Sequence, residues 1–189
     1  MKALEDHIMQ SCSIDKSELA LICRKFREKS VSKNVHFLEI GEGVKEVYFI
    51  ISGCVRTYIY DYEGVEHNIS FSMEDWWFGD LQSFIKNSPA SFSIQALEDC
   101  KVLSINKSDW DFLIAESSNF STYTRTLFRN TLFAQENRIV QNLSYSAEER
   151  YHKFMKDYPK LSQRIAQKQI ARYLGITPEF LSMIRRRQK

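Results

Sequence analysis

The clearest indication of the fold lies in the stretch QKQIARYLGITPEFLSMIRRR at residues 167–187. Ile170, Ala171 and Leu174 recur at the spacing of one helical face, which predicts a short helix with a single apolar side. Gly175 follows this helix, and glycine readily adopts the positive φ that a sharp turn requires. The first half of the stretch therefore predicts a helix that ends in a tight turn.

A second helix is predicted directly after the turn. Thr177 suits the N-cap position, Pro178 suits the first helical position, and Glu179 places negative charge at the positive end of the helix dipole. Leu181 and Ile184 give this second helix an apolar face.

The spacing of four positions across the two helices is that of a helix-turn-helix. Ala171, Gly175, Leu181 and Ile184 lie at offsets 0, 4, 10 and 13. The small residue at 171 lets the two helices approach closely, and the glycine occupies the turn. The alternative is an ordinary helical hairpin, and the spacing together with the capping residues favours the helix-turn-helix.

Basic residues concentrate at the same end of the chain. They are Lys160, Arg164, Lys168, Arg172, Arg185, Arg186, Arg187 and Lys189. With Glu179 as the only acid there, residues 160–189 carry a formal charge of +7 and residues 1–159 carry −5. A basic domain on an acidic body predicts a polyanionic partner. The alternatives are a solvated tail that happens to be basic and a protein-interaction module that binds an acidic partner.

The predicted second helix would enter the major groove of double-stranded DNA. Glu179 can accept a hydrogen bond from a cytosine amino group, and Arg186 can reach guanine or phosphate. Arg185 and Arg187 are expected to bind phosphates. The predicted DNA-binding residues are Gln167, Thr177, Pro178, Glu179, Ser182, Met183, Arg185, Arg186 and Arg187.

The middle of the chain is rich in short β-type runs. Between about residues 31 and 105 these are VHFLEI, EVYFIISG, CVRTYIYDY, VEHNISF, FSIQAL and KVLSI. The breaks between them contain glycine or acids, and DYEG at residues 61–64 suits a hairpin turn. Such a pattern predicts an antiparallel barrel or roll. Residues 4–28 are expected to be helical, with Ser13 or Asp15 as a cap.

A long helix is predicted over residues 117–143, which contain neither glycine nor proline. A shorter helix capped by Ser108 should precede it, and SAEE at residues 146–149 is a capping box that starts the next one. The long helix is apolar on more than one face, so it needs two partners, the barrel and the same helix of a second subunit. The alternative is burial within one monomer. The predicted dimer-helix residues are Phe120, Tyr123, Leu127 and Ala134.

Composition excludes several other classes of protein. The sequence contains no run of 18 apolar residues, so it predicts no membrane-spanning helix. The N-terminus MKALEDHIMQ does not match a secretory signal, and a cytoplasmic protein is therefore expected. The four cysteines lack CxxC spacing and no HExxH occurs, so neither a metal site nor another cofactor is expected. No nucleophile–base pair, P-loop or pair of catalytic carboxylates can be placed, and the chain is not expected to be an enzyme.

With these residues in place, nearly the whole chain resembles the Crp/Fnr (cyclic-AMP receptor) superfamily of bacterial transcription regulators. The stretch GEGVKEVYFIISGCVRTYIYDYEGVEHNISF resembles the first hairpins of the family's effector domain, and residues 117–143 resemble its dimerisation helix. The resemblance implies an α+β fold: a cyclic-nucleotide-binding-like antiparallel β-roll at residues 1–116, a dimerisation helix at 117–145, and a helix-turn-helix domain at 146–189. It also implies a homodimer on two-fold symmetric DNA sites, with RNA polymerase as a candidate partner.

The family's phosphate-binding cassette is altered in this sequence. The cassette runs Gly-Glu-Leu, followed ten residues beyond the Glu by an Arg that neutralises the cyclic phosphate. Here FGDLQSFIKNSPASFSIQALED at residues 78–99 holds Gly79, Asp80 and Leu81, but Ala90 and Ser91 stand where Arg and Ser or Thr are usual. A buried phosphate without a charged partner pays its desolvation cost. Control by cyclic AMP is therefore not expected, and a regulator gated by a cyclic nucleotide or another small effector is the alternative.

The resemblance departs from the family pattern at further positions. Trp76, Trp77, Phe78, Phe84 and Phe92 are expected to fill the cassette pocket or to line one for an apolar ligand. Pro178 and Met183 stand where the family's best-known pattern has arginines, so the target sequence should differ, and Ala166 stands where a capping Thr is usual. Cys12 and Cys23 do not supply the clustered cysteines of the superfamily's iron–sulfur sensors.

Overall fold

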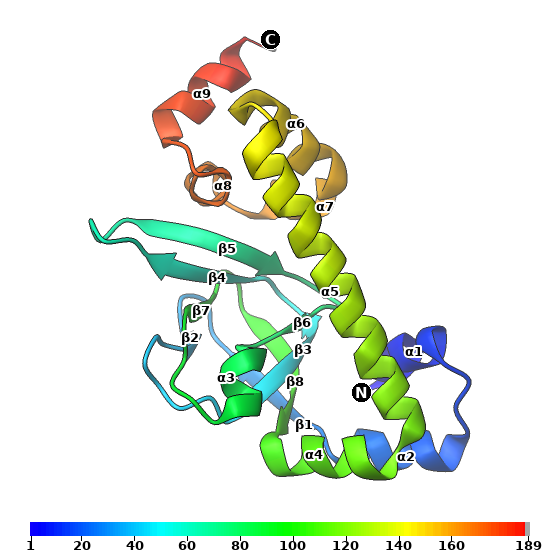
Figure 1. Cartoon of the computed structure of the whole chain (residues 1–189). Coiled ribbons are helices and arrows are strands. Elements are labelled where there is room, and N and C mark those ends of the chain that lie inside the picture. The colour runs from blue at the N-terminus through cyan, green and yellow to red at the C-terminus, as the bar shows by residue number, and fades with distance from the viewer. Residues whose placement is uncertain (188–189) are drawn as a thin grey trace. The chain divides into compact units, whose positions relative to one another are not determined.

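The computed structural model describes residues 1–187, so Gln188 and the basic residue Lys189 lie outside the described part. The helices are α1 (Lys2–Ser11), α2 (Lys16–Arg24), α3 (Leu81–Lys86), α4 (Lys107–Glu116), α5 (Ser118–Ser144), α6 (Ala147–Asp157), α7 (Pro159–Arg164), α8 (Gln167–Leu174) and α9 (Pro178–Arg186). The strands are β1 (Arg27–Val31), β2 (His36–Leu38), β3 (Glu46–Ser52), β4 (Val55–Tyr60), β5 (Glu66–Ser72), β6 (Trp77–Phe78), β7 (Ser93–Ala96) and β8 (Cys100–Asn106). Figure 1 labels these elements along the chain.

The chain divides into two compact units. Unit 1 comprises Met1–Thr57 and Phe71–Arg129, and unit 2 comprises Tyr58–Ser70 and Asn130–Lys189. The long helix α5 runs from the first unit into the second. The three-part division predicted from the sequence, with boundaries near residues 116 and 145, remains a prediction.

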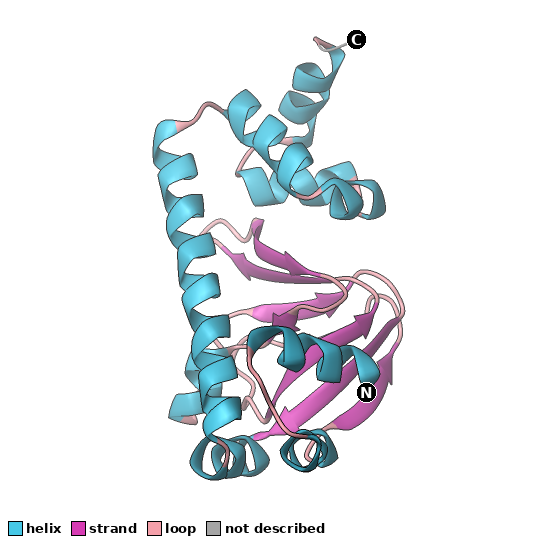
Figure 2. Ribbon diagram, turned by 90° about the vertical axis from the view of Figure 1, so that its right-hand side faces the viewer, coloured by secondary structure: helices cyan, strands magenta, loops and turns pink. Residues whose placement is uncertain are grey.

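The strands form two four-stranded sheets, in the orders β1-β8-β3-β6 and β2-β7-β4-β5. Figure 2 shows the strands in magenta and the helices in cyan. β8 pairs antiparallel with both β1 and β3, for example Leu103 with Glu28 and with Phe49. β2 pairs antiparallel with β7. The predicted antiparallel roll with flanking helices and one long helix is confirmed.

Two clusters of buried side chains make the core of unit 1. One joins α1, α2, α4 and the start of α5 to β3 and β8; its fully buried members include Leu4, Ile8, Phe49, Leu113 and Phe120. The other fills the space between the sheets; its fully buried members include Ile50, Val55, Ile94, Ala96 and Val102. No disulfide joins the four cysteines, all of which lie in the described part of the chain, and three of them are buried.

The N-terminal region was expected to be helical over residues 4–28, with Ser13 or Asp15 as a cap, and the structure has helices up to Arg24 with Asp15 as the N-cap of the second. The Asp15 carboxylate accepts hydrogen bonds from the backbone of Ser17 and Glu18 at 2.8 and 2.9 Å. The expectation was wrong at residues 27 and 28, which belong to a strand. Residues 27–31, REKSV, form the edge strand β1 because β8 pairs with their backbone from Arg27↔Ser104 to Val31↔Cys100. The expected cap of α4 was also wrong, because Asn106 rather than Ser108 accepts the hydrogen bond from Asp109.

Unit 2 contains a β-hairpin tip and a small helical domain. At the tip, Asp61 accepts hydrogen bonds from the backbone of Glu63 and Val65, both at 2.9 Å, and Gly64 has φ +78°, as the turn signal predicts. Both hydrogen bonds of the Ser146–Glu149 capping box are present at the start of α6. Buried side chains of α6 to α9 form the apolar interior of the helical domain; they include Tyr151, Phe154, Leu161, Ile170, Leu174, Leu181 and Ile184.

The start of α8 lacks a side-chain cap, because Ala166 occupies its N-cap position. We expect Ala166→Thr to raise the free energy of unfolding of this helical domain by about 1 kcal/mol, since a threonine hydroxyl can accept a hydrogen bond from a free amide of the first turn. Ala166 already has extended backbone at φ −64° and ψ 145°, which suits a capping residue. Urea unfolding monitored by helical circular dichroism measures the change, with Ala166→Val as the control that adds bulk without a cap. Equal effects of the two variants would contradict the capping argument.

Candidate nucleic-acid interface and effector pocket

The turn between α8 and α9 has the geometry that the sequence predicts. Gly175 adopts the left-handed conformation, with φ +67° and ψ 36°, and the amide of Ile176 donates to the carbonyl of Ala171 at 3.1 Å. The hydroxyl of Thr177 then caps α9 by accepting from the amide of Phe180 at 3.2 Å. Ala171 is fully buried, which lets the two helices approach closely.

One face of α9 packs inward and the opposite face is exposed. Leu181 and Ile184 are almost completely buried. The exposed residues are Thr177, Pro178, Glu179, Phe180, Ser182, Arg185, Arg186 and Arg187. The structure therefore gathers seven of the nine predicted DNA-binding residues on one surface, which we call the α9 face.

Two of the predicted DNA-binding residues are less accessible than expected. Gln167 is half-buried, and its side-chain oxygen is enclosed with no partner among the described residues. Met183 is also half-buried. Phe180, which was not predicted from the sequence, exposes 41% of its surface on the same helix. The sequence around Phe180 did not indicate that its side chain would be exposed, because an aromatic residue in a short amphipathic helix is usually part of the core.

The dimer-helix prediction is wrong for two of its four residues. Phe120 and Tyr123 are fully buried in the first core cluster of unit 1, so neither side chain has surface left for a second subunit. The Tyr123 hydroxyl accepts a hydrogen bond from Trp77 Nε1 at 2.8 Å and lies 2.7 Å from His7 Nδ1. Leu127 is half-buried against the same cluster, and Ala134 is exposed.

Farther along α5 the helix exposes a different set of large apolar side chains. They are Phe128, Leu132, Phe133, Ile139, Val140 and Leu143, and each exposes between 38% and 84% of its surface. Leu132 and Ile139 are seven residues apart, and Phe128 and Leu143 flank them at four-residue steps. This spacing is that of a coiled-coil seam. We call this set the α5 stripe.

The cassette of unit 1 is closed by its own aspartate. Asp80 is 1% exposed; its Oδ1 accepts from the amide of Ser83 at 3.0 Å, and its Oδ2 accepts from the amide of Ser91 at 2.7 Å. Ala90 is also buried, and its amide and carbonyl are bonded to Glu42 and Gly41 of the neighbouring loop. The amide at Ser91 and the carboxylate of Asp80 therefore satisfy each other, which leaves neither available to a ligand.

Aromatic side chains fill the space beside the cassette. Phe78 stacks on Tyr48 with 5.0 Å between ring centroids, and Phe37 meets both rings edge-on. Phe92 packs on this cluster, whereas Trp77 and Phe84 belong to the other core cluster of unit 1. Trp76 is 37% exposed, and Lys86 is an exposed residue at the end of α3. A cavity of about 400 Å³ borders the cassette, because Gly79 lines it together with residues that include Phe37, Glu42, Lys45 and Tyr48.

The two oxygens of Asp80 make a specific prediction possible. We expect Asp80→Asn to lower the free energy of unfolding by about 2 kcal/mol, because the isosteric amide offers one oxygen to two buried N–H donors and leaves one unsatisfied. Denaturant unfolding monitored by tryptophan fluorescence measures the change. Asp111→Asn is the control, because it removes an exposed carboxylate paired with Lys107 on α4 and should change stability by less than about 1 kcal/mol. An Asp80→Asn protein as stable as the control would contradict the closed cassette.

Two further features bear on the classes of protein considered from the sequence. Among residues 1–187, no three His, Cys, Asp or Glu side chains are grouped so that they could hold a metal ion. In the same part of the chain, no helix is long and apolar enough to cross a membrane.

Comparison with known proteins agrees with this geometry. Residues 28–117 match the family model of the cyclic nucleotide-binding domain. The fumarate and nitrate reduction regulatory protein of Yersinia pestis is 28% identical over 174 residues, which cover 84% of this chain and 67% of that protein. The regulatory protein HlyX of Actinobacillus pleuropneumoniae is 27% identical, with 84% and 70% covered.

Solved structures share the fold at lower sequence identity. The c-di-GMP responsive global regulator CLP of Xanthomonas campestris aligns with a TM-score of 0.76 at 13% identity, covering 92% of this chain and 91% of CLP. FixK2 of Bradyrhizobium japonicum aligns with a TM-score of 0.72 at 20% identity, covering 86% and 83%.

A cyclic-nucleotide-binding-like roll, a long helix and a helix-turn-helix in one chain define a class of transcription regulator. Within that class, this chain is similar to the regulators of the Crp/Fnr family.

Proposed function

We propose that this regulator binds two-fold symmetric sites in double-stranded DNA as a homodimer, without catalysing a reaction and without control by cyclic AMP. The observation that carries the proposal is the α9 face. It presents exposed polar residues on the N-capped second helix of a helix-turn-helix and three successive arginines at the end of that helix. In such a motif the second helix enters the major groove, and arginines at its end reach phosphates. RNA polymerase is the partner through which a DNA-bound regulator of this family would act.

The α5 stripe supports the homodimer. Large apolar side chains that stay exposed in a row mark an interaction surface, and a seven-residue repeat suits a second copy of the same helix. The two copies would present two α9 faces related by two-fold symmetry, which matches half-sites about one helical turn apart.

The closed cassette supports independence from cyclic AMP. A cyclic phosphate in that pocket would need a cation, and the buried residue at the relevant position is Ala90. It would also have to displace Asp80 from the amide of Ser91, to which Asp80 is already bonded at 2.7 Å. Each of these requirements opposes binding, since a buried anion without charged partners is strongly disfavoured.

Selection of random DNA by the purified protein, with and without cyclic AMP, tests the proposal. We expect an inverted repeat to be enriched equally under both conditions, with fluorescence anisotropy giving the same affinity for the winning site. A repeat enriched only with cyclic AMP would show that the cassette opens. No enriched sequence, with weak binding that falls steeply with salt, would contradict specific recognition and favour a basic protein-interaction module.

A further inference from the structure

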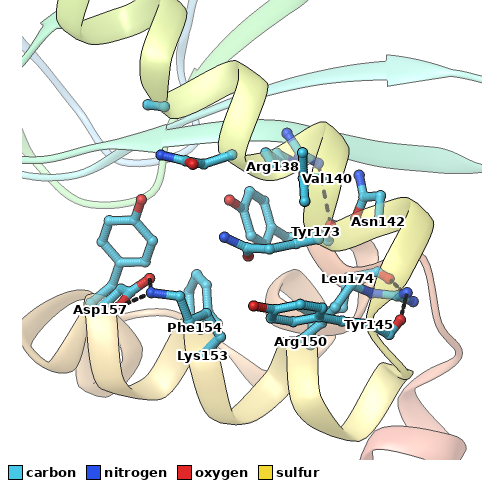
Figure 3. A pocket seen from close by; sticks show the side chains of 14 residues that line it. Arg138, Val140, Asn142, Tyr145, Arg150, Lys153, Phe154, Asp157, Tyr173 and Leu174 are labelled. Atoms are coloured by element: carbon cyan, nitrogen blue, oxygen red, sulfur yellow. Dashed lines mark hydrogen bonds and ion pairs between the residues drawn. The ribbon is translucent and has the colours of Figure 1, made fainter.

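Unit 2 contains a cavity of about 330 Å³ whose lining, apart from Val140 of the α5 stripe, the proposed function does not use. It lies between the last turns of α5, helix α6 and the end of α8, and Figure 3 shows its lining. Its size falls at the lower end of the range of small-molecule sites, so it suits a ligand of one or two rings.

Two arginines in this lining have no acidic partner among residues 1–187. Arg138 donates to the carbonyls of Asn68 and Tyr173 at 3.0 and 3.3 Å. Arg150 donates to the carbonyls of Tyr145 and Leu174 at 2.9 and 3.2 Å. Within the described residues, neither guanidinium forms an ion pair with a carboxylate.

The other charged groups of the lining compensate each other. Lys153 and Asp157, one turn apart on α6, form their own ion pair at 2.7 Å, visible beside the cavity in Figure 3. The cavity therefore has an excess of two positive charges. The carbonyls at the end of α8 carry only the partial negative charge of a helix C-terminus, which offsets a fraction of that excess.

The positive charges are also partly withdrawn from water. Burial lowers the pKa of the Arg138 guanidinium, because desolvation disfavours its charged form. The Nε atom of Arg150 is enclosed and has no hydrogen-bond partner among the described residues. A buried donor without a partner is costly, and a charge-assisted hydrogen bond to an anion would remove that cost.

Aromatic rings form the remaining walls. Tyr145, Tyr158 and Tyr173 line the cavity together with Phe154, whose ring centroid lies 5.2 Å from that of Tyr173. The guanidinium of Arg138 lies 4.2 Å from the centre of the Tyr173 ring. Planar guanidinium and phenol groups beside one another suit a planar ligand as well as an anionic one.

From this combination we propose that the cavity is a binding site for a small organic anion that joins a planar ring to a phosphate or carboxylate group. Arg138 and Arg150 bind the anionic oxygens, and the tyrosines contact the ring. The site is separate from the cassette, because every residue that lines it belongs to unit 2.

The site is also connected to the helix-turn-helix. The carbonyls that the arginines hold, those of Tyr173 and Leu174, are the last two before the Gly175 turn. An anion that draws the guanidinium groups away would release these carbonyls at the end of α8. Binding at the cavity would thus remove hydrogen bonds that hold the turn before α9. An effector bound there would act on the helix-turn-helix through this turn.

Isothermal titration calorimetry on the full chain, without DNA, tests the site. The probes are guanosine 5′-monophosphate (ring and phosphate), salicylate (ring and carboxylate), guanosine (ring alone) and inorganic phosphate (anion alone). We expect a probe with both ring and anion to bind at millimolar or lower concentration, and more tightly than either part. The stronger of guanosine 5′-monophosphate and salicylate identifies the anionic group.

Two variants and a control locate the binding. Arg150→Gln should weaken it by about tenfold or more, the size of one charge-assisted hydrogen bond. Asn142→Trp should weaken it as well, because Asn142 is exposed at the cavity and a bulky ring there blocks entry without removing a charge. Lys156→Gln, which removes a charge from an exposed position of α6 outside the cavity, should leave binding unchanged.

The proposal is overturned if no probe with both groups produces heat at millimolar concentration, in which case the arginines serve only to hold the end of α8. It is also overturned if binding survives unchanged in both Arg150→Gln and Asn142→Trp, which would place the ligand elsewhere. Thermal unfolding of the free variants shows that each is folded. Since DNA is absent from the assay, its result is independent of whether the α9 face binds DNA.

Discussion

Replacing Gly53 with alanine is expected to lower the free energy of unfolding of unit 1 by about 3 kcal/mol or more. Gly53 has φ +110°, a backbone conformation that residues with a side chain rarely adopt. A Cβ at this position would also lie 2.6 Å from Cys100 Sγ, 2.8 Å from the carbonyl oxygen of Asp99 and 2.9 Å from the Cα of Cys100. The last two of these atoms belong to the backbone, so the clash cannot be relieved by moving a flexible side chain.

Two other glycines of unit 1 separate the backbone strain from the clash. Gly41 has φ +88° with nothing within 4 Å of an added Cβ, so Gly41→Ala should cost only the strain, about 1–2 kcal/mol. Gly43 has no positive φ and is equally open, so Gly43→Ala should change stability by less than about 1 kcal/mol. All three tryptophans lie in unit 1, so denaturant unfolding followed by tryptophan fluorescence reports on it directly. A Gly53→Ala cost no larger than that of Gly41→Ala would show that the clash is relieved at no cost.

Replacing Arg185, Arg186 and Arg187 with glutamine is expected to weaken binding to the selected DNA site by about a hundredfold or more. Each exposed arginine that neutralises a phosphate also releases counterions, which makes binding weaken as salt rises. The plot of log affinity against log salt should therefore become less steep, by about 0.9 for each phosphate that is no longer neutralised. Fluorescence anisotropy at several salt concentrations measures both quantities. A change in sequence preference at one base pair would show that one of the three arginines reads a base rather than a phosphate.

The control carries the same change of charge on another part of the chain. Lys2, Lys16 and Lys33 are exposed in unit 1, and replacing all three with glutamine removes the same three positive charges. If binding depended only on net charge, the two triple variants would lose affinity equally, and that result would contradict recognition through the α9 face. A normal affinity in the lysine variant assigns the loss to the position of the arginines.

The features that could be predicted from the sequence depend on residues close together in the chain. Thr177 caps α9, Gly175 adopts a positive φ, and the Ser146–Glu149 capping box forms as expected. Each of these hydrogen bonds or conformations depends on residues within three or four positions of one another, so the local sequence is enough to predict it. The same local logic located α5 to within about a residue at each end.

The features that could not be predicted depend on partners distant in the sequence. The charged segment REKSV becomes β1 because β8, 69 to 77 residues away in the paired positions, pairs with its backbone. Phe120 and Tyr123 look like any other apolar residues of a long helix, and only the packing of α1, α4 and β3 buries them. Their burial moves the expected dimer surface farther along α5, to Leu132, Ile139 and Leu143.

The helix-turn-helix, the antiparallel roll followed by a long helix, and the loss of the cassette's cation at Ala90 could all be read from the amino-acid sequence. Folding in three dimensions was needed to bond Asp80 to Ser91, which closes the cassette, and to turn Arg138 and Arg150 toward one cavity whose carboxylate, Asp157, pairs with Lys153 instead. One cause accounts for this division. A cap or a turn is fixed by neighbouring backbone atoms, whereas the partner of a buried charge is fixed by which distant segments the fold brings to it.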